Sequence, residues 1–191
     1  MGIVITPIPT ATEPVSLELA RTHCRVDKED TGEDALFEAV YIPSGRQQVE
    51  QYTGLALLAV DVLAVMSSTA YACGCYALPL GPATELRSIT YLDADGVVQN
   101  VDLVEYGASI VREGMVWAVR TTKPLPSASS YDVAYVAGDA TGTCEPNLKL
   151  AMLLLIGDAY ENREYQVTGT IMTTNQRAVA LMDPFRVTFG V

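Results

Sequence analysis

Residues 150–156, which read Leu-Ala-Met-Leu-Leu-Leu-Ile, form an unbroken apolar run inside a segment with a helical pattern. A helix that begins at Pro146, a favoured first helical residue, and ends near Tyr165 would contain the whole run. Because the run has no polar side chain, it offers no face to water and is predicted to be buried on every side. Two arrangements satisfy this requirement: the helix is the central helix of the fold, or a second subunit covers its outer face.

The same helix is predicted to end in a charged cluster. Asp158, Glu161 and Glu164 recur every three residues and form one acidic stripe. The stripe lies near the helix C-terminus, where the helix dipole disfavours negative charge. Arg163 has no acidic residue three or four positions away, so it cannot neutralise the stripe within its own helix. We therefore expect either a solvated helix end or partners supplied by another element or another subunit.

The chain beyond this helix predicts a long polar loop, a short helix at Gln176–Met182 and an apolar tail. The loop Gln166–Asn175 is long for a compact domain, and such loops are commonly functional. The tail after Pro184 alternates apolar and polar residues with the period of a strand, which predicts docking on a sheet. The candidate subunit and partner contacts are Asp158, Glu161, Arg163, Glu164, Tyr165, Ile171, Met172, Phe185, Arg186, Val187 and Phe189.

The first part of the chain predicts an extended arm followed by helices. Its opening residues contain three prolines, which favour extended backbone. Ser16 is expected to cap a helix at Leu17–Cys24, and Asp30 with Glu33 predicts a capping box that opens a second helix.

The second helix contains two residues that disfavour helical structure, Pro43 and Gly45, so a kink or a break is expected there. Gly54 is the predicted end of this helix.

The middle of the chain changes to the period of β-strands. Residues 55–65, 86–92 and 131–138 are predicted strands, and two glycine-containing turns predict hairpins. The predicted fold is therefore α+β: a helical bundle of N-terminal helices and a long C-terminal helix, with a mostly antiparallel β-rich insertion. We expect one folding unit with an arm and helices at 1–54, the insertion at 55–145, and C-terminal helices with a docking tail at 146–191.

Composition and motifs argue against most site chemistry. With 23 acidic and 12 basic residues the net charge is −11, so the chain lacks the basic footprint of a nucleic-acid binder. His23 is the sole histidine, and Cys73 and Cys75 lack the spacing of a zinc site, so no metal or cofactor is expected. The longest apolar strand region is too short for a membrane span. The alternatives are a small enzyme with Cys24, Cys73, Cys75 or Cys144 as nucleophile and, less favoured, a nucleic-acid-binding module.

Seven short segments of the chain match a known family pattern in the same order along the sequence. They are EPVSLELARTHCRVDKED, DALFEAV, VEQYTG, ITYLDADGVVQ, YVAGDA, PNLKLAMLLLIGDAYENREY and AVALMDPFRV. Together they resemble the head–tail connector, or adaptor, proteins of long-tailed bacteriophages. VEQYTG and YENRE are the most specific of them. The sequence departs from the family pattern at Pro43-Ser44-Gly45, and its YACGCYAL segment has no counterpart there.

The resemblance implies a structural virion protein without enzymatic activity or cofactor. It implies a homo-oligomeric ring, usually dodecameric, that lies beneath the portal protein and meets a tail-side stopper or tail-completion protein. The genomic DNA would pass through the lumen during packaging and ejection without sequence-specific binding, which suits an acidic chain. The implied location is the head–tail interface of the virion, after synthesis in the host cytoplasm.

Overall fold

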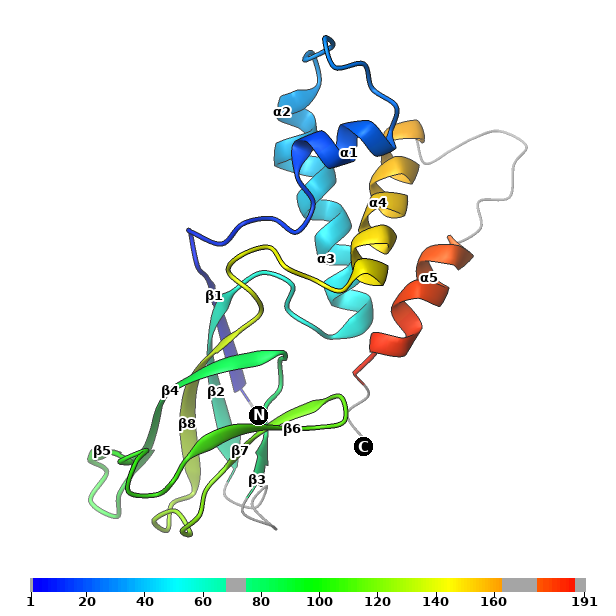
Figure 1. Cartoon of the computed structure of the whole chain (residues 1–191). Coiled ribbons are helices and arrows are strands. Elements are labelled where there is room, and N and C mark those ends of the chain that lie inside the picture. Colours follow the sequence, from blue (N-terminus) through cyan, green and yellow to red (C-terminus); the bar gives the residue numbers. More distant parts are fainter. Residues whose placement is uncertain (1, 68–74, 163–174, 188–191) are drawn as a thin grey trace. The chain divides into compact units, whose positions relative to one another are not determined.

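The computed structural model describes residues 2–67, 75–162 and 175–187 (Figure 1). The chain divides into two compact units. The β unit comprises Met1–Ala11, Leu58–Ala140 and Val187–Val191, and the helical unit comprises Thr12–Leu57 and Thr141–Arg186. Helices and antiparallel sheets both occur, so the predicted α+β class is confirmed.

The larger sheet of the β unit has five antiparallel strands in the order β1-β2-β8-β4-β5. Their bounds are Gly2–Pro7 for β1, Val60–Ser67 for β2, Ala83–Leu92 for β4, Val98–Asn100 for β5 and Ser130–Ala137 for β8. The opening residues, predicted as an extended arm, form the edge strand β1, in which Val4 lies opposite Leu63 of β2. The predicted strand at 55–65 begins only at Val60, because the backbone N–H groups of Leu55 and Leu57 bond to side chains instead.

A second sheet of the β unit has three strands in the order β3-β7-β6. Their bounds are Cys75–Ala77 for β3, Ser109–Glu113 for β6 and Val116–Arg120 for β7. The predicted β6–β7 hairpin is confirmed. One face of β8, which carries Tyr131, Val133, Tyr135 and Ala137, is buried.

The core of the β unit joins the two sheets. The ring of Tyr76 on β3 meets that of Tyr131 on β8 edge to face, with 5.6 Å between centroids. Gly81 lies so close to the indole of Trp117 that a Cβ on Gly81 would fall 2.1 Å from a ring atom, so this position accepts only glycine. The hydroxyl of the fully buried Tyr135 donates to Leu80 O and accepts from Leu80 N, each at 3.1 Å.

The helical unit contains five α-helices among the described residues. They are α1 at Leu17–His23, α2 at Asp34–Leu36, α3 at Ile42–Thr53, α4 at Pro146–Glu161 and α5 at Gln176–Met182, with a π-helical turn at Phe37–Tyr41 and a 3-10 turn at Asp183–Phe185. Ser16 caps α1 as predicted, because its Oγ accepts from Leu19 N. The predicted capping box is wrong: Asp30 Oδ1 accepts from Gly32 N in a local turn, and helix α2 begins only at Asp34.

Pro43 and Gly45 do not break the second helix. A π-helical turn precedes α3, in which Ile42 N donates to Phe37 O five residues back, and Pro43 then occupies the first turn of α3. Proline is tolerated in a first turn, and π-turns accommodate local irregularity within a continuing helix. Gly45 is buried against α4, and Gly54 ends α3 in the left-handed conformation with φ of +73°.

Helix α4 begins at Pro146 as predicted and is buried along most of its apolar run. Ala151, Met152, Leu153 and Ile156 are buried. Leu150, Leu154 and Leu155 are only half-buried, so the prediction of burial on every side is wrong for this chain taken alone. The reason is that α1, α3, α5 and the π-helical turn are the described elements packed against α4, and they leave these three leucines partly uncovered.

Candidate interaction site

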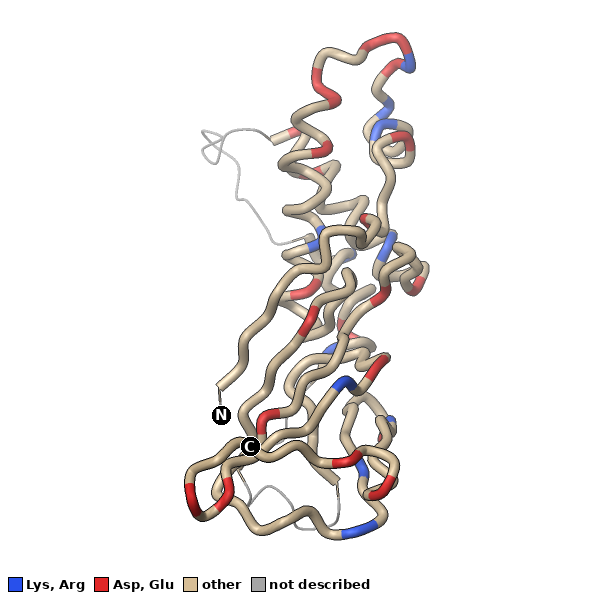
Figure 2. Tube along the Cα trace, turned by 90° about the vertical axis from the view of Figure 1, so that its left-hand side faces the viewer, with Lys and Arg blue, Asp and Glu red and all other residues tan. Residues whose placement is uncertain are grey.

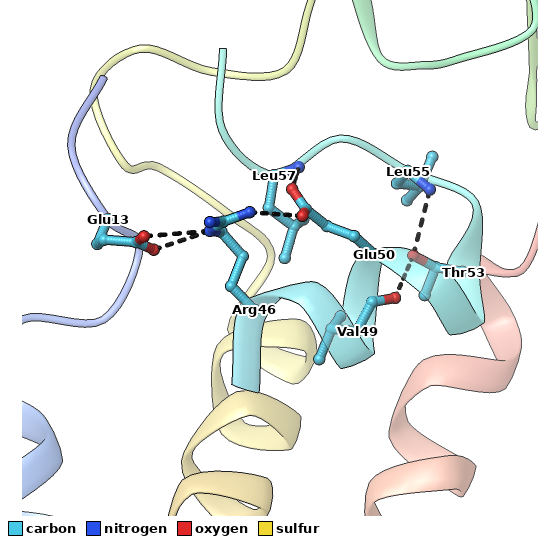
Figure 3. Close-up of polar contacts among 7 residues, drawn as sticks. All are labelled: Glu13, Arg46, Val49, Glu50, Thr53, Leu55 and Leu57. Carbon is cyan, nitrogen blue, oxygen red and sulfur yellow. Dashed lines mark hydrogen bonds and ion pairs between the residues drawn. The ribbon is translucent and has the colours of Figure 1, made fainter. Parts of the chain in front are cut away.

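A polar network on α3 fastens two neighbouring segments to that helix (Figure 3). Arg46 Nε lies 3.0 Å and 3.2 Å from the two carboxylate oxygens of Glu13, which precedes α1. Arg46 Nη1 lies 2.6 Å from Glu50 Oε2, and Glu50 Oε1 accepts from Leu57 N at 2.8 Å. The Arg46 side chain is only 14% exposed, so its positive charge is largely removed from water. The carboxylates of Glu13 and Glu50 compensate for the lost hydration of that charge.

The network accounts for part of the VEQYTG segment, which comprises residues 49–54. Val49 is fully buried, and the fully buried Thr53 donates to Val49 O at 2.7 Å and accepts from Leu55 N at 3.3 Å. Sequence reasoning missed the pairing of Arg46 with Glu13, which are 33 residues apart. A signal was available for Arg46 and Glu50, because opposite charges four residues apart on a helix attract each other.

The acidic end of α4 has a partner within the chain. Asn175 Nδ2 donates to Asp158 Oδ2 at 2.6 Å, and Asn175 Oδ1 caps α5 by accepting from Ala178 N at 3.0 Å. One asparagine therefore links the last turn of α4 to the first turn of α5. Glu161 is exposed and lies near Cys24 at the end of α1.

The surroundings of Cys24 make it a weak nucleophile. Burial raises the pKa of the Cys24 thiol, and the negative charge of Glu161 raises it further. Because the thiolate is the reactive species, both effects lower reactivity at neutral pH.

An open groove with a volume of about 370 Å³ runs along α3, α4 and α5. Its lining residues are Gln48, Gln51, Tyr52, Leu155, Asn175, Ala178, Val179 and Met182. The Tyr52 hydroxyl donates to Asp183 Oδ1, and this bond is the main cause that raises the pKa of Tyr52. The guanidinium of Arg186 lies 5.5 Å from the centre of the Tyr52 ring, a cation–π distance.

The predicted interface residues occupy different surroundings. Asp158, Glu161 and Arg186 are exposed, whereas Phe185 and Val187 are half-buried. Phe185 lies in the 3-10 turn, so the predicted strand period is wrong at that residue. The remaining candidates, Arg163, Glu164, Tyr165, Ile171, Met172 and Phe189, lie outside the described residues.

The charges of the described chain are mostly acidic and are spread over both units (Figure 2). Within residues 2–67, 75–162 and 175–187, no group of three His, Cys, Asp or Glu side chains is placed to hold a metal ion. Among the helices in those ranges, none is long and apolar enough to cross a membrane.

Three solved structures with the same fold belong to gene transfer agent particles. The chain matches a protein in the neck of an empty gene transfer agent particle, computed with C6 symmetry, with a TM-score of 0.75 and 21% identity. It matches a protein in the virion of a native gene transfer agent particle with a TM-score of 0.76 and 20% identity. A third match, in the neck of the native particle computed with C12 symmetry, has a TM-score of 0.73 and 19% identity. Each match covers 100% of this chain and 98% of the other chain.

No protein-family model and no curated protein matches the sequence. The structural likeness extends over the whole length of both chains and establishes a common fold. The chain therefore has a fold that is found in virion proteins, which agrees with the sequence resemblance. More particularly, it shares that fold with proteins of gene transfer agent particles and their necks.

Proposed function

We propose that this protein is a structural neck protein of a phage-like virion, a head–tail connector that forms a ring beneath the portal. In this proposal the ring joins the capsid to tail-side stopper or completion proteins, and genomic DNA passes through its lumen without sequence-specific contacts. The helices form a bundle, and the β unit is the insertion carried by that bundle. The protein acts by binding other proteins and catalyses no reaction.

The observation that carries the proposal is the common fold with gene transfer agent neck proteins over the full length of both chains. A match that covers a single sheet or helix pair would fit many functions, because folds are shared by unrelated activities. Here both units match together, and the independent resemblance of segments such as VEQYTG points to the same class. The necks that contain these two similar proteins were computed with C6 and C12 symmetry, which supports a ring of identical subunits.

The charge of the chain also supports a channel-forming role. A net charge of −11 repels a DNA duplex, so DNA could slide through a ring of such subunits without adhering to it. In this proposal the exposed residues Asp158, Glu161 and Arg186 belong to the contacts with neighbouring subunits or the portal. The candidates Arg163, Glu164, Tyr165, Ile171, Met172 and Phe189 are proposed to act with them.

The direct test is electron cryo-microscopy of particles that contain the chain. The expected result is density for a ring of this fold between the portal and the tail-side proteins. A simpler measurement is light scattering of the full chain mixed with its cognate portal protein, where a stable complex is expected. Absence of any association with portal or tail-side proteins would contradict the proposal, and tight salt-dependent binding to duplex DNA would favour a nucleic-acid-binding module instead.

A further inference from the structure

The edge strand β1 is unusually exposed for an apolar strand. All six of its residues are exposed, and Ile3, Val4 and Ile5 expose 43%, 59% and 49% of their surface. By contrast, its neighbour β2 is an internal strand, because it pairs with β1 along one edge and with β8 along the other. Among the described strands, none pairs with the outer edge of β1, so no described strand satisfies its outward backbone donors and acceptors.

The residues of β1 are those of an internal strand. Ile3 and Ile5 share a face with the buried residues Ala64 and Val62, and Val4 shares the other face with Leu63. Both faces of β1 are therefore apolar, a composition typical of strands that are covered on all sides. Natural edge strands usually carry charged residues, bulges or prolines, which prevent pairing with another chain. Strand β1 has no charged residue and no bulge, and its one proline, Pro7, lies at its end.

A second apolar surface lies at the opposite edge of the same sheet, where the β4–β5 hairpin forms the border (Figure 1). Leu92 and Val98 lie opposite each other and expose 52% and 66% of their surface. Val97 in the turn and Val104 beyond β5 expose 54% and 90%. The hairpin is preformed, because Asp93 Oδ1 accepts from Val97 N at 2.9 Å and its Oδ2 accepts from the Gln99 side chain at 2.8 Å.

We infer that β1 of one copy pairs with β5 of the next copy, so that the five-stranded sheets of a ring join edge to edge. This inference rests on the proposed ring, because a ring needs two different, complementary surfaces on each subunit. The apolar edge strand β1 and the opposite border of the same sheet at β5 are two such different surfaces. The occupant of the β1 edge is therefore a second copy of this chain, presenting its β4–β5 hairpin.

The strand directions fix the geometry of this pairing. Each neighbouring pair in the order β1-β2-β8-β4-β5 is antiparallel, so β1 and β5 run in the same direction. The rotation that relates neighbouring subunits of a ring of many copies is small and nearly preserves strand direction. The β1–β5 pairing between copies is therefore parallel, whereas a twofold dimer through β1 would be antiparallel.

Charge repulsion is weakest along the two strands themselves. Copies that each carry a net charge of −11 repel one another, so contact is most favourable where ionisable side chains are absent. Neither β1 nor β5 contains an ionisable side chain, and β1 carries no charge along its whole length in Figure 2. Asp93, Asp95 and Asp102 lie in the turn before β5 and in the segment after it, beside the inferred contact and outside the two paired strands.

The test is photo-crosslinking from position 4 in the full chain assembled with its cognate portal protein. Val4 is replaced by p-benzoylphenylalanine, and crosslinked peptides are identified by mass spectrometry. The expected product joins position 4 to residues 92–104 of another copy. The matched control places the same group at Val40, which is 48% exposed in the helical unit and should not label that hairpin.

Assembly and crosslinking are read separately. Crosslinks from position 4 to β1 of another copy, to the C-terminal residues 185–191 or to another protein, or no crosslink in an intact ring, overturn the inference and leave the proposed ring standing. If the unmodified chain forms no ring on the portal, the proposed function itself fails.

As a second measure, Val4→Lys should lower the assembled fraction at least about tenfold while Val40→Lys leaves it unchanged. Unchanged assembly of folded Val4→Lys also overturns the inference.

Discussion

Gly45 of α3 lies directly against Ile156 of α4: a Cβ built on Gly45 would come within 2.9 Å of Ile156 Cγ1 and 3.3 Å of Met152 O. The two helices therefore approach each other at a point where any side chain larger than hydrogen would push them apart. The glycine, which sequence reasoning treated as a helix breaker, is a packing residue.

The first prediction follows from this contact. Replacing a glycine inside a helix with alanine ordinarily stabilises a protein by up to about 1 kcal/mol. For Gly45→Ala the clash with Ile156 should reverse the sign and lower the free energy of unfolding by about 1–3 kcal/mol. Urea denaturation followed by circular dichroism measures the change.

Gly157 is the matched control for Gly45, because it lies within α4 and has room for a methyl group. A Cβ there would lie 3.5 Å from the ring of His23, an ordinary van der Waals distance. Gly157→Ala should therefore leave stability unchanged or raise it by up to about 1 kcal/mol. Equal effects of the two substitutions would show that the close approach of α3 and α4 at Gly45 is not rigid.

The second prediction concerns the network of Arg46. Arg46→Ala leaves the carboxylates of Glu13 and Glu50 close together without their shared cation and should lower the free energy of unfolding by about 2–4 kcal/mol. Arg120→Ala is the control, because the ion pair of Arg120 with Glu113 is more than half exposed and should contribute only about 0–1 kcal/mol. Thermal unfolding of both variants gives the comparison, and a cost for Arg46 no larger than that for Arg120 would contradict a fastening role.

Local rules predicted the ends of helices well. Ser16, Gly54 and Pro146 begin or end helices where capping and backbone preferences place them, because these preferences act within a few residues. The period of two likewise predicted a strand at 131–138, where β8 lies, because side chains along a strand repeat every two residues.

The errors arose where distant segments decide the outcome. The effect of Gly45 depends on Ile156, which is far away in sequence. Arg46 pairs with Glu13, which precedes α1, in addition to its partner within α3. The candidate site shows the same limit. The acidic stripe was found from its spacing, but the bond from Asn175 to Asp158 depends on where the chain returns after α4.

The third prediction addresses the alternative of a cysteine-dependent enzyme. Because burial and Glu161 raise the pKa of Cys24, a thiol-reactive probe should modify Cys24 in the folded chain more slowly than an ordinary exposed thiol at neutral pH. Glu161→Gln removes one of the two causes, so the pKa should fall and the rate should rise on the order of a few-fold. Mass spectrometry of labelled peptides gives both rates, with a short cysteine-containing peptide as the reference for an ordinary exposed thiol. Rapid labelling of Cys24 in the unmodified chain would revive the enzyme hypothesis.

The fourth prediction concerns the predicted interface at the end of α4. If Arg163 pairs with a neighbouring subunit or with the portal, Arg163→Ala should weaken assembly on the portal several-fold while the unfolding temperature of the free chain stays the same. Arg120→Ala, at an exposed arginine of the β unit, serves as the control for removal of one positive charge. Assembly is followed by light scattering. Unchanged assembly of Arg163→Ala would show that this side chain is merely solvated.

The fifth prediction is a loss of stability in alkali that depends on Tyr135. Burial raises the pKa of the Tyr135 hydroxyl to about 12, whereas in the unfolded chain it ionises near its ordinary value of about 10. The folded state thus favours the neutral hydroxyl, so its contribution to stability is complete below pH 10 and falls as the pH rises from about 10 to about 12. Tyr135→Phe removes this titration and the hydrogen bonds to Leu80, so it should cost about 1–3 kcal/mol at pH 8. The difference in unfolding free energy between the two proteins should then narrow between pH 10 and 12. A difference that stays constant over that range would show that Tyr135 does not ionise upon unfolding there.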